Sequence, residues 1–195
     1  MSANLARAME SFVTDTYGRT VWQDMVRAAR LDFDSFELLF EYPHTVTEPV
    51  LDAAADRLQR TRADLMEDLG TYLVSHPRMV GIRRLLRFGG DDFETFLDSL
   101  RELPDRARLV LPDLQLPSLR LKDEGNGAYA LDCSKASADL CGVLVGGIRA
   151  MADDYGALVT TELKTGPGNA CRIEIVVLSS RFTPGRAFEL AERST

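Results

Sequence analysis

Hydrophobic residues recur at helical spacing through the first half of the chain. Apolar side chains three and four positions apart form one face of an α-helix, because the helix turns once in about 3.6 residues. Runs of this kind cover residues 5–13, 21–29, 50–58, 65–73, 78–88 and 93–103. Residues 33–49, which contain Tyr42-Pro43, show no such period. The pattern therefore predicts a helical first half with one irregular connection.

Short polar residues mark the beginnings of two of these helices. Thr61, with Asp64 three residues on, is typical of an N-cap, and Asp91-Asp92 stands directly before the run that starts at residue 93. Pro104 follows that run. Proline inside a helix removes a backbone hydrogen bond and clashes with the preceding turn, at about 3 kcal/mol, so we expect this helix to stop or kink there.

The pattern changes to strands from Pro112 onward. Two short extended segments, 117–121 and 128–133, flank the turn sequence Glu-Gly-Asn-Gly at 124–127, and Asn-Gly favours a tight hairpin. One amphipathic helix follows at 140–151. Residues 158–163 and 171–177 then form a second pair of strands around Gly-Pro-Gly. Helices followed by an antiparallel sheet with one helix on it define an α+β fold.

Length and composition are those of one globular domain. The chain has 195 residues, of which 45% are hydrophobic and 27% charged. We predict one domain over residues 1–182, with a helical part at about 1–111 and a sheet part at about 112–182. Residues 183–195 are predicted to be a C-terminal tail. An α+β domain of this kind leaves the function open.

The net charge of −7 argues against a nucleic acid or an anionic membrane as partner, because both are bound through clustered lysine and arginine. The nearest basic cluster is Arg78, Arg83, Arg84 and Arg87. Helical spacing places it opposite apolar residues, so we interpret it as a solvated helix face. No apolar stretch approaches the roughly 20 residues that span a bilayer, and no secretory leader is visible.

The three cysteines, Cys133, Cys141 and Cys171, are odd in number and contain no CxxC pair. This pattern supports neither a disulfide framework nor a zinc site. We expect small buried thiols in a soluble, cytoplasmic protein, because a reducing compartment fits best.

The sequence contains no common catalytic signature: GxSxG, a P-loop, HExxH and a strand followed by GxGxxG are all missing. Capping or solvation explains the adjacent carboxylates at 91–92 and 153–154. His44 and His76 each stand beside a proline and are interpreted as ordinary loop or cap residues. We expect no enzyme, and an enzymatic alternative would need a cluster of perturbed acids in a cleft.

Several segments resemble the heme nitric oxide/oxygen binding (H-NOX) family, which is related to the heme domain of soluble guanylate cyclases. They are Phe-Val-Thr-Asp-Thr-Tyr-Gly at 12–18, Val-Trp at 21–22, Tyr-Pro at 42–43, Leu-Met-Glu-Asp-Leu-Gly-Thr-Tyr at 65–72, the glycine- and leucine-containing helix at 81–89, and Phe-Leu-Asp-Ser-Leu at 96–100. The resemblance covers nearly the whole chain in the family's order. It implies a helical subdomain followed by an antiparallel sheet with a helix, and heme as the cofactor.

The resemblance also locates the family's heme-ligating histidine, and this sequence has none there. Counting forward from Leu100 places the position on Arg101, and counting backward from Arg108 and Pro112 places it on Pro104. We prefer Pro104 because more flanking residues agree. Neither residue offers iron a lone pair, since arginine stays protonated and the proline nitrogen is an amide.

The family's Tyr-x-Ser-x-Arg motif, which binds the heme propionates, is degraded as well. One register places Tyr129 at the tyrosine, Leu131 at the serine and Cys133 at the arginine. Another places Ser134 at the serine, and Lys135 supplies one charge there. No register restores the whole motif.

We therefore expect a stand-alone H-NOX-like sensory or regulatory protein that does not ligate heme through histidine. By family analogy it acts on a signalling protein in trans, a histidine kinase or a cyclic-di-nucleotide enzyme. The pocket between the subdomains is filled by side chains, holds another apolar ligand, or keeps heme by packing alone. The alternative is a working heme sensor for nitric oxide or oxygen with a substitute axial ligand.

Overall fold

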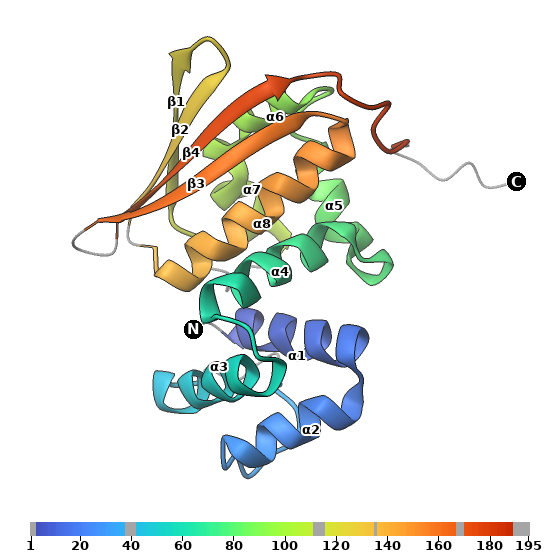
Figure 1. Ribbon diagram of the computed structural model, residues 1–195, viewed down its shortest axis with the longest axis vertical. Coiled ribbons are helices and arrows are strands. Elements are labelled where there is room, and N and C mark those ends of the chain that lie inside the picture. The colour runs from blue at the N-terminus through green and yellow to red at the C-terminus, as the bar shows by residue number, and fades with distance from the viewer. Residues whose placement is uncertain (1–2, 38–41, 111–115, 135, 167–169, 189–195) are drawn as a thin grey trace, which may run out of the picture. The chain divides into compact units, whose positions relative to one another are not determined.

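The computed structural model describes residues 3–37, 42–110, 116–134, 136–166 and 170–188. The chain forms two compact units, Met1–Leu69 and Gly70–Thr195. Helices make up the first unit, and helices with an antiparallel sheet make up the second (Figure 1). The α+β class predicted from the sequence is confirmed.

The first unit contains α1 (Ala3–Tyr17), α2 (Arg19–Ala28), α3 (His44–Leu58) and the start of α4 (Arg62–Ser75). Gly18 separates α1 from α2 with φ +94°, a conformation that costs glycine little. Thr61 caps α4 as expected, because its Oγ accepts the Asp64 N–H at 3.1 Å. The sequence placed an irregular stretch as far as residue 49, whereas α3 begins at His44 and contains Pro49. The N–H groups of Val46 and Thr47 both donate to the Pro43 carbonyl, at 2.9 and 3.3 Å, and so close the first turn ahead of Pro49, which lies inside the helix and has no N–H of its own to donate.

In the second unit a chain of short helices follows α4. It comprises the 3₁₀ helix η1 (Pro77–Met79), α5 (Val80–Arg87), α6 (Phe93–Ser99), the 3₁₀ helix η2 (Leu100–Glu102) and α7 (Leu103–Val110). The helix is interrupted near Pro104 as predicted, but the interruption is the 3₁₀ helix η2, which precedes the proline. Pro104 is the second residue of α7, where a missing N–H leaves no hydrogen bond unmade.

The sheet contains β1 (Ser118–Gly125), β2 (Ala128–Ser134), β3 (Leu158–Gly166) and β4 (Ala170–Ser179), in the antiparallel order β1-β2-β4-β3. The Asn-Gly hairpin is confirmed: Asn126 and Gly127 have φ +54° and +76°, as a type I′ turn requires. One face carries cross-strand ion pairs, among them Lys164–Glu174 at 2.7 Å. The other face is apolar.

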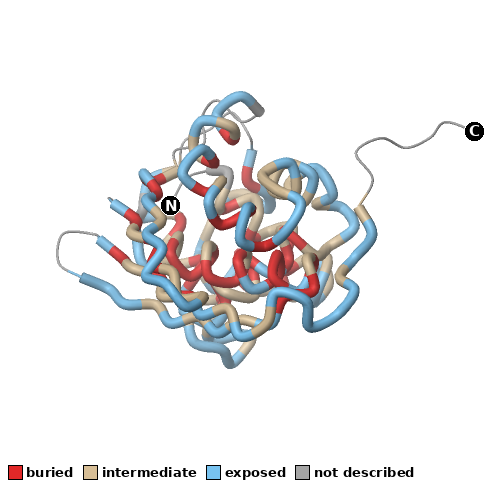
Figure 2. Tube along the Cα trace, turned by 90° about the horizontal axis from the view of Figure 1, so that it is seen from above, coloured by how far each residue is buried: buried red, intermediate tan, exposed pale blue. Residues whose placement is uncertain are grey.

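The helix α8 (Ala138–Tyr155) runs along the apolar face of this sheet and contacts β3 and β4 (Figure 1). Ser137 caps it and Gly156, with φ +79°, ends it. Along the helices and strands, buried residues alternate with exposed ones (Figure 2), because each element packs one face on the core and turns the other to solvent. The core of the second unit includes Phe93 and Phe96 of α6, Leu131 of β2, Met151 of α8 and Ile173 of β4.

Gly70, near the end of α4, brings that helix against the backbone of α8. A Cβ at Gly70 would lie 2.1 Å from the Val143 carbonyl oxygen and 2.7 Å from the Gly147 nitrogen. Only a residue without a side chain permits so close an approach. This crossing places the two helices on adjoining sides of the cavity described next.

Candidate functional site

A cavity of about 200 Å³ lies in the second unit among α4, α5, η2, α7 and α8. Its described lining is Gly70, Leu73, Val74, Gly81, Ile82, Leu85, Leu86, Phe96, Leu100, Leu103, Ala107, Leu116, Leu140, Val143, Leu144, Gly147 and Ile148. Every one of these side chains is a hydrocarbon, or a glycine hydrogen. The described part of the wall therefore offers a ligand van der Waals contact and no polar side chain.

Leu100, Leu103 and Ala107 bring the η2–α7 segment into this wall. Pro104 is half-buried and lies on the helical face shared by 100, 103 and 107, since neighbours on one face are three or four residues apart. The Arg101 side chain is 69% exposed, and its Nε lies 3.8 Å from Oε1 of Glu102. Neither of the two positions considered for an iron ligand is among the lining residues: Pro104 is half-buried beside the lining residue Leu103, and the side chain at 101 is in solvent.

The predicted propionate positions on β2 fall on two faces of the sheet. Tyr129, Leu131 and Cys133 alternate with their neighbours and share the face that packs on the helices, where Leu131 and Cys133 are buried. Ser134 is exposed at the strand end, on the opposite face. Lys135 lies outside the described residues.

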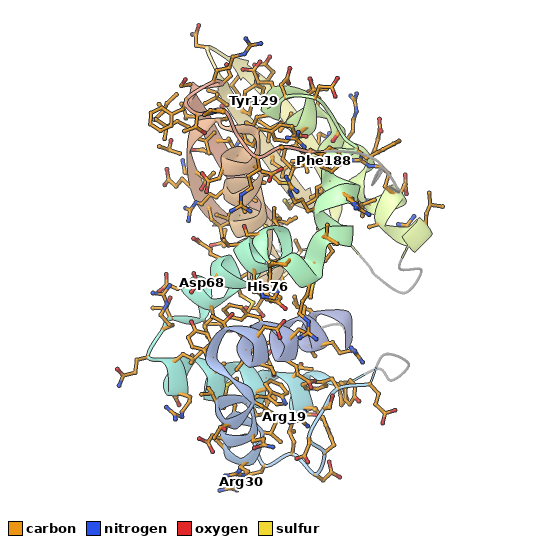
Figure 3. All side chains as sticks on the ribbon, turned by 90° about the vertical axis from the view of Figure 1, so that its right-hand side faces the viewer. Arg19, Arg30, Asp68, His76, Tyr129 and Phe188 are labelled. Carbon is orange, nitrogen blue, oxygen red and sulfur yellow. A yellow bond between two sulfur atoms is a disulfide. The ribbon has the colours of Figure 1, made fainter. Side chains whose placement is uncertain are left out.

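The side chains on this face of β2 are poorly suited to bind a carboxylate. Burial raises the pKa of the Cys133 thiol to about 11, so the group is neutral at physiological pH. Burial is also the main cause of the raised pKa of Tyr129, which is labelled in Figure 3. Leu131 has no polar atom in its side chain. The face therefore presents no cation at the three positions of the first register.

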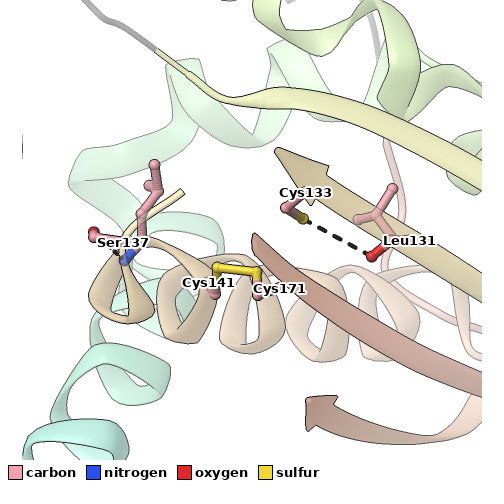
Figure 4. The surroundings of a disulfide bond; sticks show 6 residues. Leu131, Cys133, Ser137, Cys141 and Cys171 are labelled. Carbon is pink, nitrogen blue, oxygen red and sulfur yellow. Dashed lines mark hydrogen bonds between the residues drawn. A yellow bond between two sulfur atoms is a disulfide. The ribbon is translucent and has the colours of Figure 1, made fainter. Parts of the chain in front are cut away.

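Cys141 of α8 and Cys171 of β4 form a disulfide, with their Cα atoms 6.7 Å apart (Figure 4). The expectation of three unpaired thiols was wrong. Cys133 remains free and lies opposite Cys171 in the β2–β4 register. The two bonded cysteines are 30 residues apart in sequence and meet only because α8 crosses the start of β4.

Arg78 and Arg84 are exposed, as expected for a solvated helix face, but Arg83 and Arg87 of α5 are not part of such a face. Arg83 Nε lies 2.8 Å from Oδ1 of Asp154, and Arg87 Nε lies 3.8 Å from its Oδ2. Asp154 is only 2% exposed, so it is not the solvated carboxylate that the sequence suggested. The guanidinium of Arg87 also stacks over the Tyr155 ring, 4.0 Å from its centroid. A buried carboxylate needs such partners, because an unpaired charge is costly away from water.

This cluster also fastens the C-terminal segment, which we define as residues 180–188. Arg83 Nη2 donates to the Ala187 carbonyl at 3.1 Å, and the Arg186 N–H donates to the Asp154 carbonyl at 2.8 Å. The Phe188 ring, labelled in Figure 3, lies 5.0 Å from the Arg87 guanidinium. No sequence motif indicated this cluster, although an arginine pair four residues apart was visible. The predicted tail lies outside the described residues from 189 onward.

His76 plays the structural part expected from its place beside Pro77. Its Nδ1 accepts the Arg78 N–H at 3.4 Å, and its ring stacks on Tyr72 with the centroids 4.7 Å apart. This geometry caps η1 and occupies one ring nitrogen. The side chain of His44 lies outside the described residues.

Comparison with known families identifies the domain. The family model HNOB, described as Haem-NO-binding, matches residues 4–163. The chain belongs to this family, the H-NOX proteins. Two curated relatives are soluble guanylate cyclase gcy-31 of Caenorhabditis elegans, 22% identical over 121 residues, and guanylate cyclase soluble subunit beta-2 of Rattus norvegicus, 28% identical over 91 residues. The matches cover 62% and 47% of this chain but only 17% and 13% of those proteins.

Solved H-NOX structures share the fold at low sequence identity. A mutant H-NOX protein from S. oneidensis in the Fe(II) ligation state has a TM-score of 0.76 at 17% identity, covering 93% of this chain and 98% of that one. An Fe(II) unliganded H-NOX protein from K. algicida has a TM-score of 0.72 at 13% identity, covering 91% and 96%. H-NOX domains are sensor domains and are not themselves catalytic. Among the described residues of this chain, no helix is long and apolar enough to cross a bilayer.

The residues of this H-NOX chain do not fit the family's heme. Axial ligation needs a lone pair such as His, Cys, Met or Tyr provides, and the described cavity wall is hydrocarbon throughout. The propionates need charge-assisted donors, whereas Leu131 and Cys133 are buried and uncharged. The fold of the family is kept, and the chemistry that holds its cofactor is missing from the described site.

Proposed function

We propose that this H-NOX protein is a sensory or regulatory module that works without histidine-ligated heme. The observation that supports the proposal is the cavity wall itself: Leu100, Leu103 and Ala107 of the η2–α7 segment line it with hydrocarbon, and neither Arg101 nor Pro104 offers iron a lone pair. We take Pro104 as the ligand position, because the side chain of Arg101 is in solvent.

The output of the module is proposed to pass to a separate signalling protein, either a histidine kinase or a cyclic-di-nucleotide enzyme. The supporting argument is family membership, since H-NOX domains work with signalling effectors. Neither nucleic acid nor a membrane is proposed as a partner, in keeping with the net charge of −7. No catalytic activity is proposed for the domain.

A cytoplasmic location completes this proposal, because the proposed partners act there. The Cys141–Cys171 disulfide stands against it, since disulfides are rare in reducing compartments. Thiol labelling of freshly lysed cells, before and after reduction, decides the matter. A protein that is fully reduced in the cell supports the cytoplasm, and a fully oxidised one contradicts it.

Heme reconstitution tests the central claim. The purified protein, incubated with hemin, reduced and exposed to nitric oxide, is expected to show only the absorption of free heme. A strong Soret band that shifts with nitric oxide would overturn the proposal in favour of a heme sensor with a substitute axial ligand. The absorbance readout needs no knowledge of the partner.

Two variants ask which feature excludes heme. Pro104→His supplies an imidazole at the preferred ligand position, and Arg101→His is the matched control in the other register. We expect both to stay free of bound heme, because Leu131 and Cys133 still offer the propionates no charge. A Soret band in Pro104→His alone would show that loss of the ligand is the single barrier.

A further inference from the structure

The cavity of the second unit differs from a merely under-packed core in its size and its access. Its volume of about 200 Å³ exceeds the roughly 150 Å³ of an apolar protein cavity that stays dry and binds benzene. Gly81 in its wall is exposed, and Ile82 and Leu144 are half-buried, so the wall reaches the protein surface. A ligand from solution has a route to this space.

The chemistry of the wall restricts what the cavity accepts. A carboxylate or ammonium group placed against hydrocarbon loses its hydration without gaining a partner, and such transfers are strongly unfavourable. An uncharged hydrocarbon group, in contrast, gains contacts with leucine, valine and phenylalanine side chains and leaves water. The wall therefore selects against charge over its whole described surface.

Size restricts the ligand further. A void of this volume has room for one ring with a short substituent or for two fused rings. The close crossing of α4 and α8 at Gly70 sets one limit of the space, because backbone atoms of Val143 and Gly147 lie against that glycine. These two helices cannot separate without breaking this contact.

We propose that the cavity among α4, α5, α7 and α8 binds a small uncharged apolar molecule of one or two rings in place of heme. This inference rests on the proposed function, because it assigns the ligand class of the same sensory site. The residues of this chain do not fit the family's cofactor, and the proposal accounts for this by a change of ligand at the same site.

The test compares toluene with benzoate, which have the same ring and differ in carrying a methyl or a carboxylate group. Calorimetric titration and thermal unfolding of the full chain are the readouts. Toluene at ten times its Kd is expected to raise Tm by about 3–6 °C, and benzoate at the same concentration to leave Tm unchanged. Equal responses to both, or no response to toluene, would overturn the proposal.

Three variants tie the response to the cavity. Ala107→Leu places added carbons at a buried lining position and is expected to abolish the toluene shift. Leu109→Ala, on the same helix but 86% exposed, is expected to keep it. Gly147→Ala has room for its methyl group, since the nearest atom lies 3.9 Å away, and is expected to weaken binding in a protein that still folds. An undiminished shift in both Ala107→Leu and Gly147→Ala would place toluene elsewhere.

The two proposals fail in different ways. A ligated Soret band with hemin overturns the proposed function whatever toluene does. If the sample with hemin shows only the absorption of free heme and the protein does not respond to toluene, the proposed function stands and only this ligand class is lost.

Discussion

Arg83 of α5 and Asp154 of α8 form a nearly buried ion pair, with Nε 2.8 Å from Oδ1. The Arg83 and Asp154 side chains are 20% and 2% exposed. Such a pair adds little stability compared with a well-packed apolar pair, but removing one partner leaves the other buried and uncompensated. The same two residues also hold the C-terminal segment through Ala187 and Arg186.

Replacing Asp154 with alanine is therefore expected to destabilise the protein and to loosen this segment at Ala187, where Arg83 holds it, while the Arg186 N–H keeps its hydrogen bond to the backbone carbonyl of residue 154. We expect the free energy of unfolding to fall by about 3–5 kcal/mol, because the guanidinium groups of Arg83 and Arg87 lose their shared carboxylate. Urea unfolding measures the loss, and limited trypsin digestion at Arg186 measures the release. The neighbouring exposed Asp153 provides the matched control. Asp153→Ala with an equal effect would contradict the role assigned to the ion pair.

The cap of α6 predicts a specific dependence on pH. The N–H and hydroxyl of Thr95 both donate to Asp92, and these hydrogen bonds hold the pKa of that carboxyl below its ordinary value of 3.8. A lowered pKa in the folded state stabilises the protein above pH 3.8, and this contribution is lost as the pH falls through the folded-state pKa. Asp92→Ala is expected to cost about 1 kcal/mol at neutral pH and much less in acid.

Urea unfolding of Asp92→Ala and of the parent protein, at neutral pH and again at a pH of about 2, checks this expectation. Asp91→Ala is the control, since Asp91 is exposed and stands one residue outside the cap. A stability difference between parent and Asp92→Ala that is the same at both pH values would refute the cap as its source.

The disulfide predicts a sensitivity to reductant. It closes a loop of about 30 residues, and restricting the unfolded chain in this way contributes about 2–4 kcal/mol. Unfolding in dithiothreitol should therefore occur at a lower urea concentration. The double variant Cys141→Ala/Cys171→Ala should be less stable than the oxidised parent and indifferent to dithiothreitol. Cys133→Ala should keep the parent's response, and if it lost that response the pairing would be wrong.

Two glycines on the crossing of α4 and α8 should respond oppositely to the same substitution. Gly70→Ala forces a methyl group onto the backbone of Val143, 2.1 Å from its oxygen, and should destabilise the protein by about 1–3 kcal/mol or more. Gly147→Ala has nothing nearer than 3.9 Å and should stabilise it by about 0.4–1 kcal/mol. Thermal unfolding of the pair measures both signs, and two losses of equal size would count against the helix crossing described above.

Local signals in the sequence were enough for much of the fold. The caps at Thr61 and Asp92 and the Asn126-Gly127 hairpin depend on residues a few positions apart, and all three are confirmed. Hydrophobic periodicity separated the helical part from the strands for the same reason. Helix ends were less accurate, as the early start of α3 before Pro49 shows.

Features that join distant parts of the chain were missed. The bond between Cys141 and Cys171 depends on where α8 crosses the sheet, which an odd count of cysteines does not reveal. The pairing of Arg83 with Asp154 joins residues 71 positions apart, and each alone has the sequence surroundings of a solvated charge. For the candidate site, sequence alignment left 101 and 104 open, and the structure adds that the Arg101 side chain is 69% exposed whereas Pro104 is half-buried.

Two sides of the helix α5 make contacts within the second unit. Ile82, Leu85 and Leu86 border the cavity, while Arg83 and Arg87 hold Asp154. Apolar contacts weaken gradually as helices separate, but a charge-assisted hydrogen bond of 2.8 Å weakens steeply with distance and angle. The distance between α5 and α8 therefore fixes two things at once, the width of the cavity between them and the Arg83–Asp154 contact beside it.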